Sequence, residues 1–97
     1  MNISYINKRG DKMYTTRLYV SFEYLGNAEY ETLPYKSSML ISAYARVNSG
    51  VVIDDTMFKK INEGIKHDIS ERYNIEVKNI PETDFVILFW GEVLYSG

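Results

Sequence analysis

The chain contains 97 residues, of which 45% are hydrophobic and 25% are charged, and its formal net charge at pH 7 is -2. These values are typical of one folded domain with a modest core, and they argue against a disordered chain or a strongly basic nucleic-acid-binding protein. Cysteine is absent, which excludes disulfide scaffolds and thiolate metal sites.

Two segments in the first half of the chain have the alternating hydrophobicity of half-buried β-strands. They cover residues 14–25 (YTTRLYVSFEYL) and 39–47 (MLISAYARV), where apolar side chains recur at every second position. Residues 3–6 and the surroundings of Tyr30 are candidates for shorter strands. A polar connection punctuated by glycine and proline separates the two long segments, and we assume that they pair antiparallel across it.

The pairing register of this hairpin decides which side chains share its outer surface. A shift of the register by one residue turns one strand's side chains to the opposite face, and a shift by two residues restores them. Every second antiparallel register therefore keeps the apolar side chains of both segments on one face. We assume the register that sets Leu18 opposite Ala45. On the other face, this register places two pairs side by side: Tyr19 with Tyr44, and Arg17 with Arg46.

The second half of the chain begins with a helical pattern. Asp54 is a suitable N-cap and Asn74 suits the left-handed residue that ends a helix. Gly64 costs about 1 kcal/mol relative to alanine, so the helix depends on tertiary packing. The apolar residues recur at intervals of three or four, which predicts an amphipathic helix with these residues on its buried face: Phe58, Ile61, Ile65, Ile69 and Tyr73.

Residues 85–94 form the last predicted strand and include an unbroken run of six large apolar side chains, FVILFW. A run that is apolar on both faces usually marks a central strand, so we place this segment inside the sheet. One helix covers only one face, and leaving three such side chains in water would forgo about 1.5–3 kcal/mol each. The second face therefore needs a cover: the N-terminal strand or the connection at residues 26–38, a second copy of the chain, or a different partner. The uncovered set is one of two: Phe85, Ile87 and Phe89, or Val86, Leu88 and Trp90.

These elements predict a single α+β domain over residues 1–97. We expect an antiparallel or mixed sheet of three to five strands with one amphipathic helix packed on one face, in the order ββαβ. Small extra strands at Ile3 and Ile75 would complete the sheet.

The residue types of common catalytic and metal sites are not grouped in this sequence. His67 has Glu63 and Glu71 four residues to either side, but ordinary i,i+4 pairs on a solvated helix face explain this row, as they do Asp68 with Arg72. No nucleophile elbow, GxGxxG, Walker loop, HExxH or EF-hand spacing occurs. We therefore expect a protein that is not an enzyme and that has no cofactor and no metal.

Aromatic and basic side chains on the open sheet face are the candidate functional residues. Tyrosine and arginine are favoured at protein interfaces, and they also stack single-stranded bases, although tyrosine is common on any exposed strand. A protein partner or a homodimer is favoured over nucleic acid, and a small-molecule or nucleotide module is a third alternative. The candidate interface residues are Arg17, Tyr19, Tyr44, Arg46, Phe85, Ile87, Phe89 and Trp90.

The overall pattern resembles small proteins of bacteriophages and mobile elements in low-GC bacteria. The resemblance covers residues 14–95 and lies in a tyrosine-rich hairpin (RLYVSFEY, MLISAYARV), a helix of the type MFKKINEGIKHDISERY and the closing FVILFWGEVLY. It implies a protein that binds and blocks a host or rival protein in the host cytoplasm, including anti-defence and anti-CRISPR roles. A cytoplasmic protein without a membrane partner also agrees with the absence of a secretory signal and of an apolar run near the ~18 residues that span a membrane.

Overall fold

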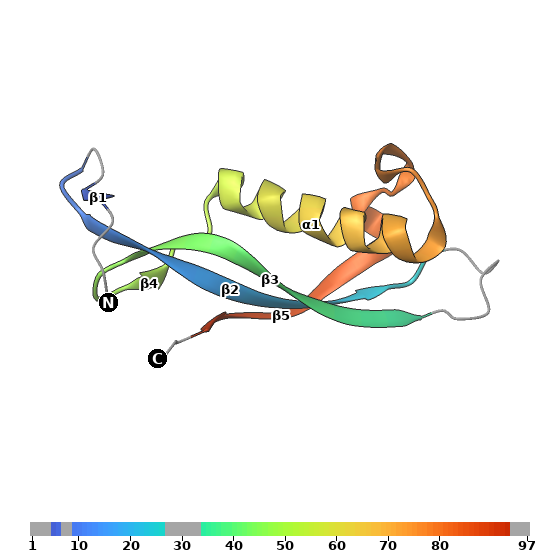
Figure 1. The fold of residues 1–97 in the computed structure, drawn as a ribbon, viewed down its shortest axis with the longest axis horizontal. Helices are drawn as coiled ribbons and strands as arrows, with labels where there is room; N and C mark the ends of the chain where they lie inside the picture. Colours follow the sequence, from blue (N-terminus) through green and yellow to red (C-terminus); the bar gives the residue numbers. More distant parts are fainter. Residues whose placement is uncertain (1–4, 7–8, 27–33, 94–97) are drawn as a thin grey trace.

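A long antiparallel hairpin of β2 (Lys12–Tyr24) and β3 (Tyr35–Arg46) carries the other elements of the fold. The computed structural model describes residues 5–6, 9–26 and 34–93, and the statements below refer to these residues. Helix α1 (Asp55–Tyr73) runs along one side of the twisted hairpin (Figure 1). The remaining elements are β1 (Tyr5–Ile6), β4 (Gly50–Val51), two short 3-10 helices, η1 (Val77–Asn79) and η2 (Glu82–Asp84), and β5 (Phe85–Val93).

This architecture confirms the predicted α+β class with one helix and an antiparallel sheet. Four strands rather than two precede α1, so the predicted order ββαβ describes only the long elements. Residues 75 and 76 are not extended into a strand, and the two 3-10 helices follow them. The strand predicted at Ile75 is therefore wrong. The short strand predicted at residues 3–6 is confirmed at its described residues, which form β1, while the one predicted around Tyr30 falls outside the described residues.

Strand β2 is the centre of the sheet, and all pairings described are antiparallel. One edge of β2 pairs with β3, and its other edge pairs with β1 at Lys12–Met13 and with β5 at Arg17–Tyr24; β4 pairs with β3. Among the described strands, β5 pairs with β2 alone. The prediction that β5 is a central strand is therefore wrong, because β5 forms an edge of the sheet.

The hairpin register differs from the assumed one. Leu18 lies opposite Ile41 rather than Ala45, a shift of four residues. Because this shift is even, the apolar residues of both strands still share one face, as the alternation requires. Periodicity thus identifies the buried face correctly but does not select the register.

The ends of α1 agree with the predicted capping residues. The Asp54 carboxylate accepts a hydrogen bond from the Met57 amide at 2.8 Å, and Asn74 ends the helix in the left-handed conformation with φ 56°. Phe58 was expected in the core but is 45% exposed, and Met57 is buried in its place. The buried stripe follows a spacing of four residues along the helix: Met57, Ile61, Ile65 and Ile69.

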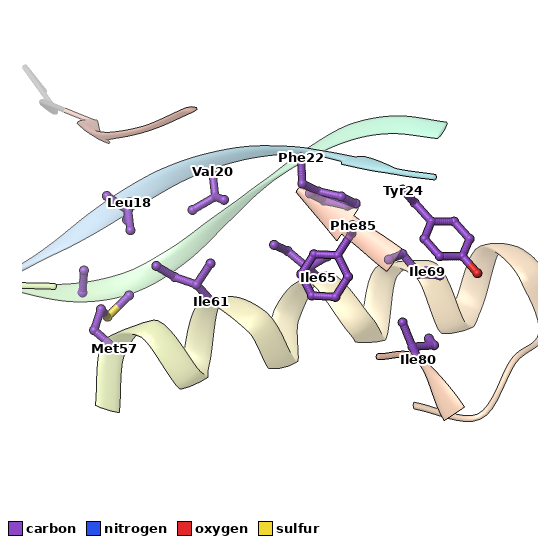
Figure 2. Packing of buried hydrophobic residues seen from close by; sticks show 11 residues of the cluster. Leu18, Val20, Phe22, Tyr24, Met57, Ile61, Ile65, Ile69, Ile80 and Phe85 are labelled. Atoms are coloured by element: carbon purple, nitrogen blue, oxygen red, sulfur yellow. The ribbon is translucent and has the colours of Figure 1, made fainter. Parts of the chain in front are cut away.

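The core lies between this stripe of α1 and one face of the sheet (Figure 2). Fully buried Leu18, Val20 and Phe22 supply the face of β2, and Phe85 from β5 and Ile80 join the same cluster. A Cβ added to Gly64 would lie 2.9 Å from Sδ of Met39 on β3. The glycine in the middle of α1 therefore allows the helix to approach the sheet closely.

Candidate protein interface

A β-bulge divides β5 into two halves whose side chains alternate out of phase. The register with β2 shifts between Ser21 and Phe22: Phe89 pairs with Ser21 while Ile87 pairs with Phe22, which leaves Leu88 without a partner on β2. Such an extra residue interrupts the alternation of a strand.

The bulge changes which residues of β5 share a face. Paired residues of adjacent strands point to the same side, so the buried face of β2 identifies the helix side of β5. The helix-side residues of the apolar run are Phe85, Ile87 and Trp90, and the opposite, outer face carries Val86 and Phe89. Neither of the two predicted sets is correct, because both assumed an uninterrupted strand.

Two of the predicted interface residues belong to the core. Phe85 is 5% exposed, and Ile87 is partly buried against the core cluster. Phe89 and Trp90, by contrast, remain 59% and 41% exposed. Helix α1 therefore covers the first half of the apolar run and leaves both aromatic rings that follow the bulge accessible.

The outer face of the sheet carries exposed apolar side chains on β5 and on the two strands of the hairpin. The rings of Tyr19 and Phe89 are in contact, with centroids 6.2 Å apart. Leu40, opposite Tyr19 on β3, is 54% exposed, and Val86 is 43% exposed. We call Tyr19, Leu40, Val86 and Phe89 the outer-face patch; Leu40 and Val86 extend the surface predicted from the sequence.

A groove runs between α1 and β5 on the helix side, with a volume of about 730 Å³. Phe58 of α1 and Trp90 of β5 are two of its apolar lining residues, and they are 45% and 41% exposed. Its lining is completed by Phe85, Val86 and Ile87 with the polar residues Asp55, Lys59, Asn62 and Glu82. Since Val86 belongs both to this groove and to the outer-face patch, β5 has exposed apolar surface on two sides.

The structure separates the basic residues that the assumed register brought together. Arg17 lies opposite Ser42, and Tyr44 lies opposite Thr15. Arg46 lies opposite Met13 near the far end of the hairpin and forms an ion pair with Asp11 at 3.5 Å. The predicted Tyr19–Tyr44 and Arg17–Arg46 neighbours are therefore wrong, and Arg46 is remote from the outer-face patch.

Polar side chains between α1 and β3 form a cluster around Tyr35. The Tyr35 hydroxyl donates to Asp68 at 2.9 Å, Ser37 donates to the same carboxylate, and Arg72 lies over the Tyr35 ring at 4.9 Å. Burial is the largest effect that raises the pKa of Tyr35, and the hydrogen bond to Asp68 adds to it. Both members of the expected Asp68–Arg72 pair thus bind Tyr35, which ties the helix to β3.

A second polar cluster fixes the end of β5. Glu92 accepts hydrogen bonds from the hydroxyls of Thr16 at 2.8 Å and Tyr14 at 3.0 Å. Desolvation is the largest cause of the raised pKa of Tyr14, followed by the hydrogen bond to Glu92. The only negative charge of β5 is therefore held by β2 on the helix side.

His67 is the only histidine of the sequence. It is exposed on α1, and no group of three or more metal-ligating side chains occurs within the described ranges. The same part of the chain has no helix that is long and apolar enough to cross a membrane. Comparison with protein-family models, curated proteins and solved structures found no match to this chain.

Proposed function

We propose that this protein is a non-enzymatic interaction module that binds its protein partner at β5. The observation that carries the proposal is the position of an apolar strand at the sheet edge, with Trp90 exposed on one side and Phe89 on the other. Exposed apolar surface of this kind marks interaction sites in folded proteins.

The edge of β5 has few of the features that prevent strand pairing. Proteins usually protect edge strands with lysine, proline or inward-pointing charges, none of which occurs from Phe85 to Gly91. Two protective features are present in β5: the helix-side charge of Glu92 near its end, and the bulge at Leu88, which bends the strand without adding charge. A partner strand added to this edge would gain main-chain hydrogen bonds, and its side chains would cover Trp90 and Phe89.

A second copy of the chain is the occupant that fits this edge. An antiparallel pairing of two β5 strands that is symmetric about Leu88 and Phe89 sets Ile87 opposite Trp90 and Val86 opposite Gly91. Helix-side residues then meet helix-side residues, outer residues meet outer residues, and no like charges are opposed. A two-fold axis makes such a contact self-complementary, as in most homodimers.

A strand from another protein would use the same edge. The phage-like pattern of the sequence favours a host or rival protein as such a partner, which the module would block by occupying its surface. Both occupants require β5, so a variant of β5 tests the proposal for either one.

The test compares two lysine substitutions at outer-face positions that are similarly exposed. Val86→Lys places a charge on β5. Leu40→Lys places the same charge on β3, whose edge away from β2 is also unpaired at this position among the described strands. We expect Val86→Lys to raise the dissociation constant of the dimer at least about tenfold, equivalent to ~1.4 kcal/mol, and Leu40→Lys to have a smaller effect. Sedimentation velocity over a concentration series measures both.

The outcomes separate the occupants and expose a wrong proposal. A concentration-dependent dimer that Val86→Lys dissociates supports the second copy. If the protein is a monomer, a host partner isolated with it should lose binding to Val86→Lys but not to Leu40→Lys. That result supports a strand from another protein as the occupant. If Leu40→Lys disrupts the complex while Val86→Lys does not, binding does not occur at β5 and the proposal is wrong.

A further inference from the structure

A depression lies over the hairpin where residues 15–17 of β2 pair with residues 42–44 of β3. It has a volume of about 490 Å³. Arg17 and Tyr44 lie on its outer-face side, and Lys60 reaches it from α1. This feature is independent of β5 and of the function proposed above.

Two residues that line the depression turn their side chains away from the outer face. Thr16 and Ala43 lie opposite each other in its middle, and both side chains point toward the helix side. Ala43 is buried in the core, and the Thr16 hydroxyl donates to Glu92 at 2.8 Å. The neighbouring side chains of Thr15, Arg17, Ser42 and Tyr44 therefore surround an open space of the outer face.

Neither basic side chain at the depression has a carboxylate partner among the described residues. Lys60 Nζ donates to the backbone oxygen of Ser42 at 2.8 Å, which holds the ammonium group beside β3. Arg17 takes part in no ion pair or hydrogen bond within the described residues, and no carboxylate lines the depression. Lys36 and Arg46 of the same hairpin, by contrast, are paired with Glu23 and Asp11. Two positive charges without a carboxylate partner among the described residues thus line one depression on a chain whose net charge is -2.

We propose that this depression binds a phosphate group. The planar guanidinium of Arg17 offers paired N–H donors to phosphate oxygens, and the Lys60 ammonium retains donors beyond the one used on Ser42. The ring of Tyr44, which is 51% exposed, lies beside the charges and offers a stacking surface for a base. A nucleotide or the backbone of a single-stranded nucleic acid carries the required phosphate.

Amide chemical-shift titration tests the site, with sodium phosphate added at constant ionic strength against sodium chloride. We expect saturable shifts at the amides of residues 15–17 and 42–44. Arg17→Gln should raise the dissociation constant about fivefold, the upper range for one exposed charge pair. The matched control is Lys78→Gln, which removes the same charge from a lysine that is paired with Glu76 outside the depression; this variant should leave the affinity unchanged.

Two further probes identify the source of the phosphate. A mononucleotide that binds as tightly as a single-stranded oligonucleotide indicates a small phosphorylated ligand. Tighter oligonucleotide binding that weakens with salt indicates nucleic acid. The proposal is overturned if phosphate causes no saturable shift at the depression, or if Lys78→Gln weakens binding as much as Arg17→Gln.

Discussion

Gly64 brings α1 close to the sheet, and substituting it with alanine sets two effects of similar size against each other. Alanine is favoured over glycine in a helix interior by about 1 kcal/mol. The added Cβ would lie 2.9 Å from Sδ and 3.1 Å from Cε of Met39, both closer than ordinary van der Waals contact. Met39 must therefore leave its present conformation to admit the methyl group.

The cost of that movement follows from the chemistry of methionine. Both contacting atoms belong to the flexible end of the side chain, and a displacement of about 30° from a preferred rotamer costs on the order of 0.5–1.5 kcal/mol. The gain and the cost nearly cancel, so we expect Gly64→Ala to change the free energy of unfolding by less than about 0.5 kcal/mol. When Met39 is alanine, the obstacle is gone and the full gain of about 1 kcal/mol should return.

A double-mutant cycle measures this difference directly. Urea denaturation of the wild type, Gly64→Ala, Met39→Ala and the double variant gives the coupling energy between the two positions. We expect a coupling of about 0.5–1.5 kcal/mol, with alanine at position 64 more favourable in the Met39→Ala background. A coupling below about 0.3 kcal/mol, the level of independent sites, would refute the close approach as the reason for glycine.

Two further predictions concern the cap of α1 and the Tyr35 cluster. Asp54→Ala removes the 2.8 Å bond to the Met57 amide and should cost about 1 kcal/mol in urea denaturation, more than the neighbouring Asp55→Ala; equal costs would contradict the capping role. Burial, and then the bond to Asp68, raises the pKa of Tyr35 above 10.0, so the unfolded phenol ionises at a lower pH than the folded one. Stability from this group is complete below pH 10.0 and falls as pH rises toward the folded pKa. Over that pH interval, the free energy of unfolding of Tyr35→Phe should fall less than that of the wild type. If both fall equally with pH, the Tyr35 phenol does not cause the loss.

The helix was predictable in detail because its signals are local in the sequence. The side chain of Asp54 caps an amide only three residues away, and Asn74 needs only its own backbone angles. The exposure of Phe58 is the part that local reasoning missed. A stripe spaced by four residues turns Met57 toward the core, and only the position of the sheet distinguishes this stripe from one that contains Phe58.

The position and faces of β5 were less predictable because they depend on distant pairings. Its partner β2 lies more than half the chain away, and composition does not show whether a strand has one neighbour or two. The apolar run suggested a central strand, whereas its helix-side residues Phe85 and Ile87 are buried by the core at the sheet edge. The bulge was equally hidden, since nothing in the letters FVILFW marks Leu88 as the residue outside the ladder.

The bulge also gives β5 an unusual tolerance of changes in length. Losing one residue from a paired strand normally turns every later side chain to the opposite face. Losing Leu88 would instead remove the only residue outside the register and keep Phe89 opposite Ser21 and Trp90 opposite Val20. If Leu88 entered the ladder in place of Phe89, Trp90 would leave the groove for the outer face and Glu92 would leave Thr16. The residue that stands outside the ladder therefore decides which aromatic side chain belongs to each surface of β5, and a shift of register at Leu88 would exchange them with every side chain kept.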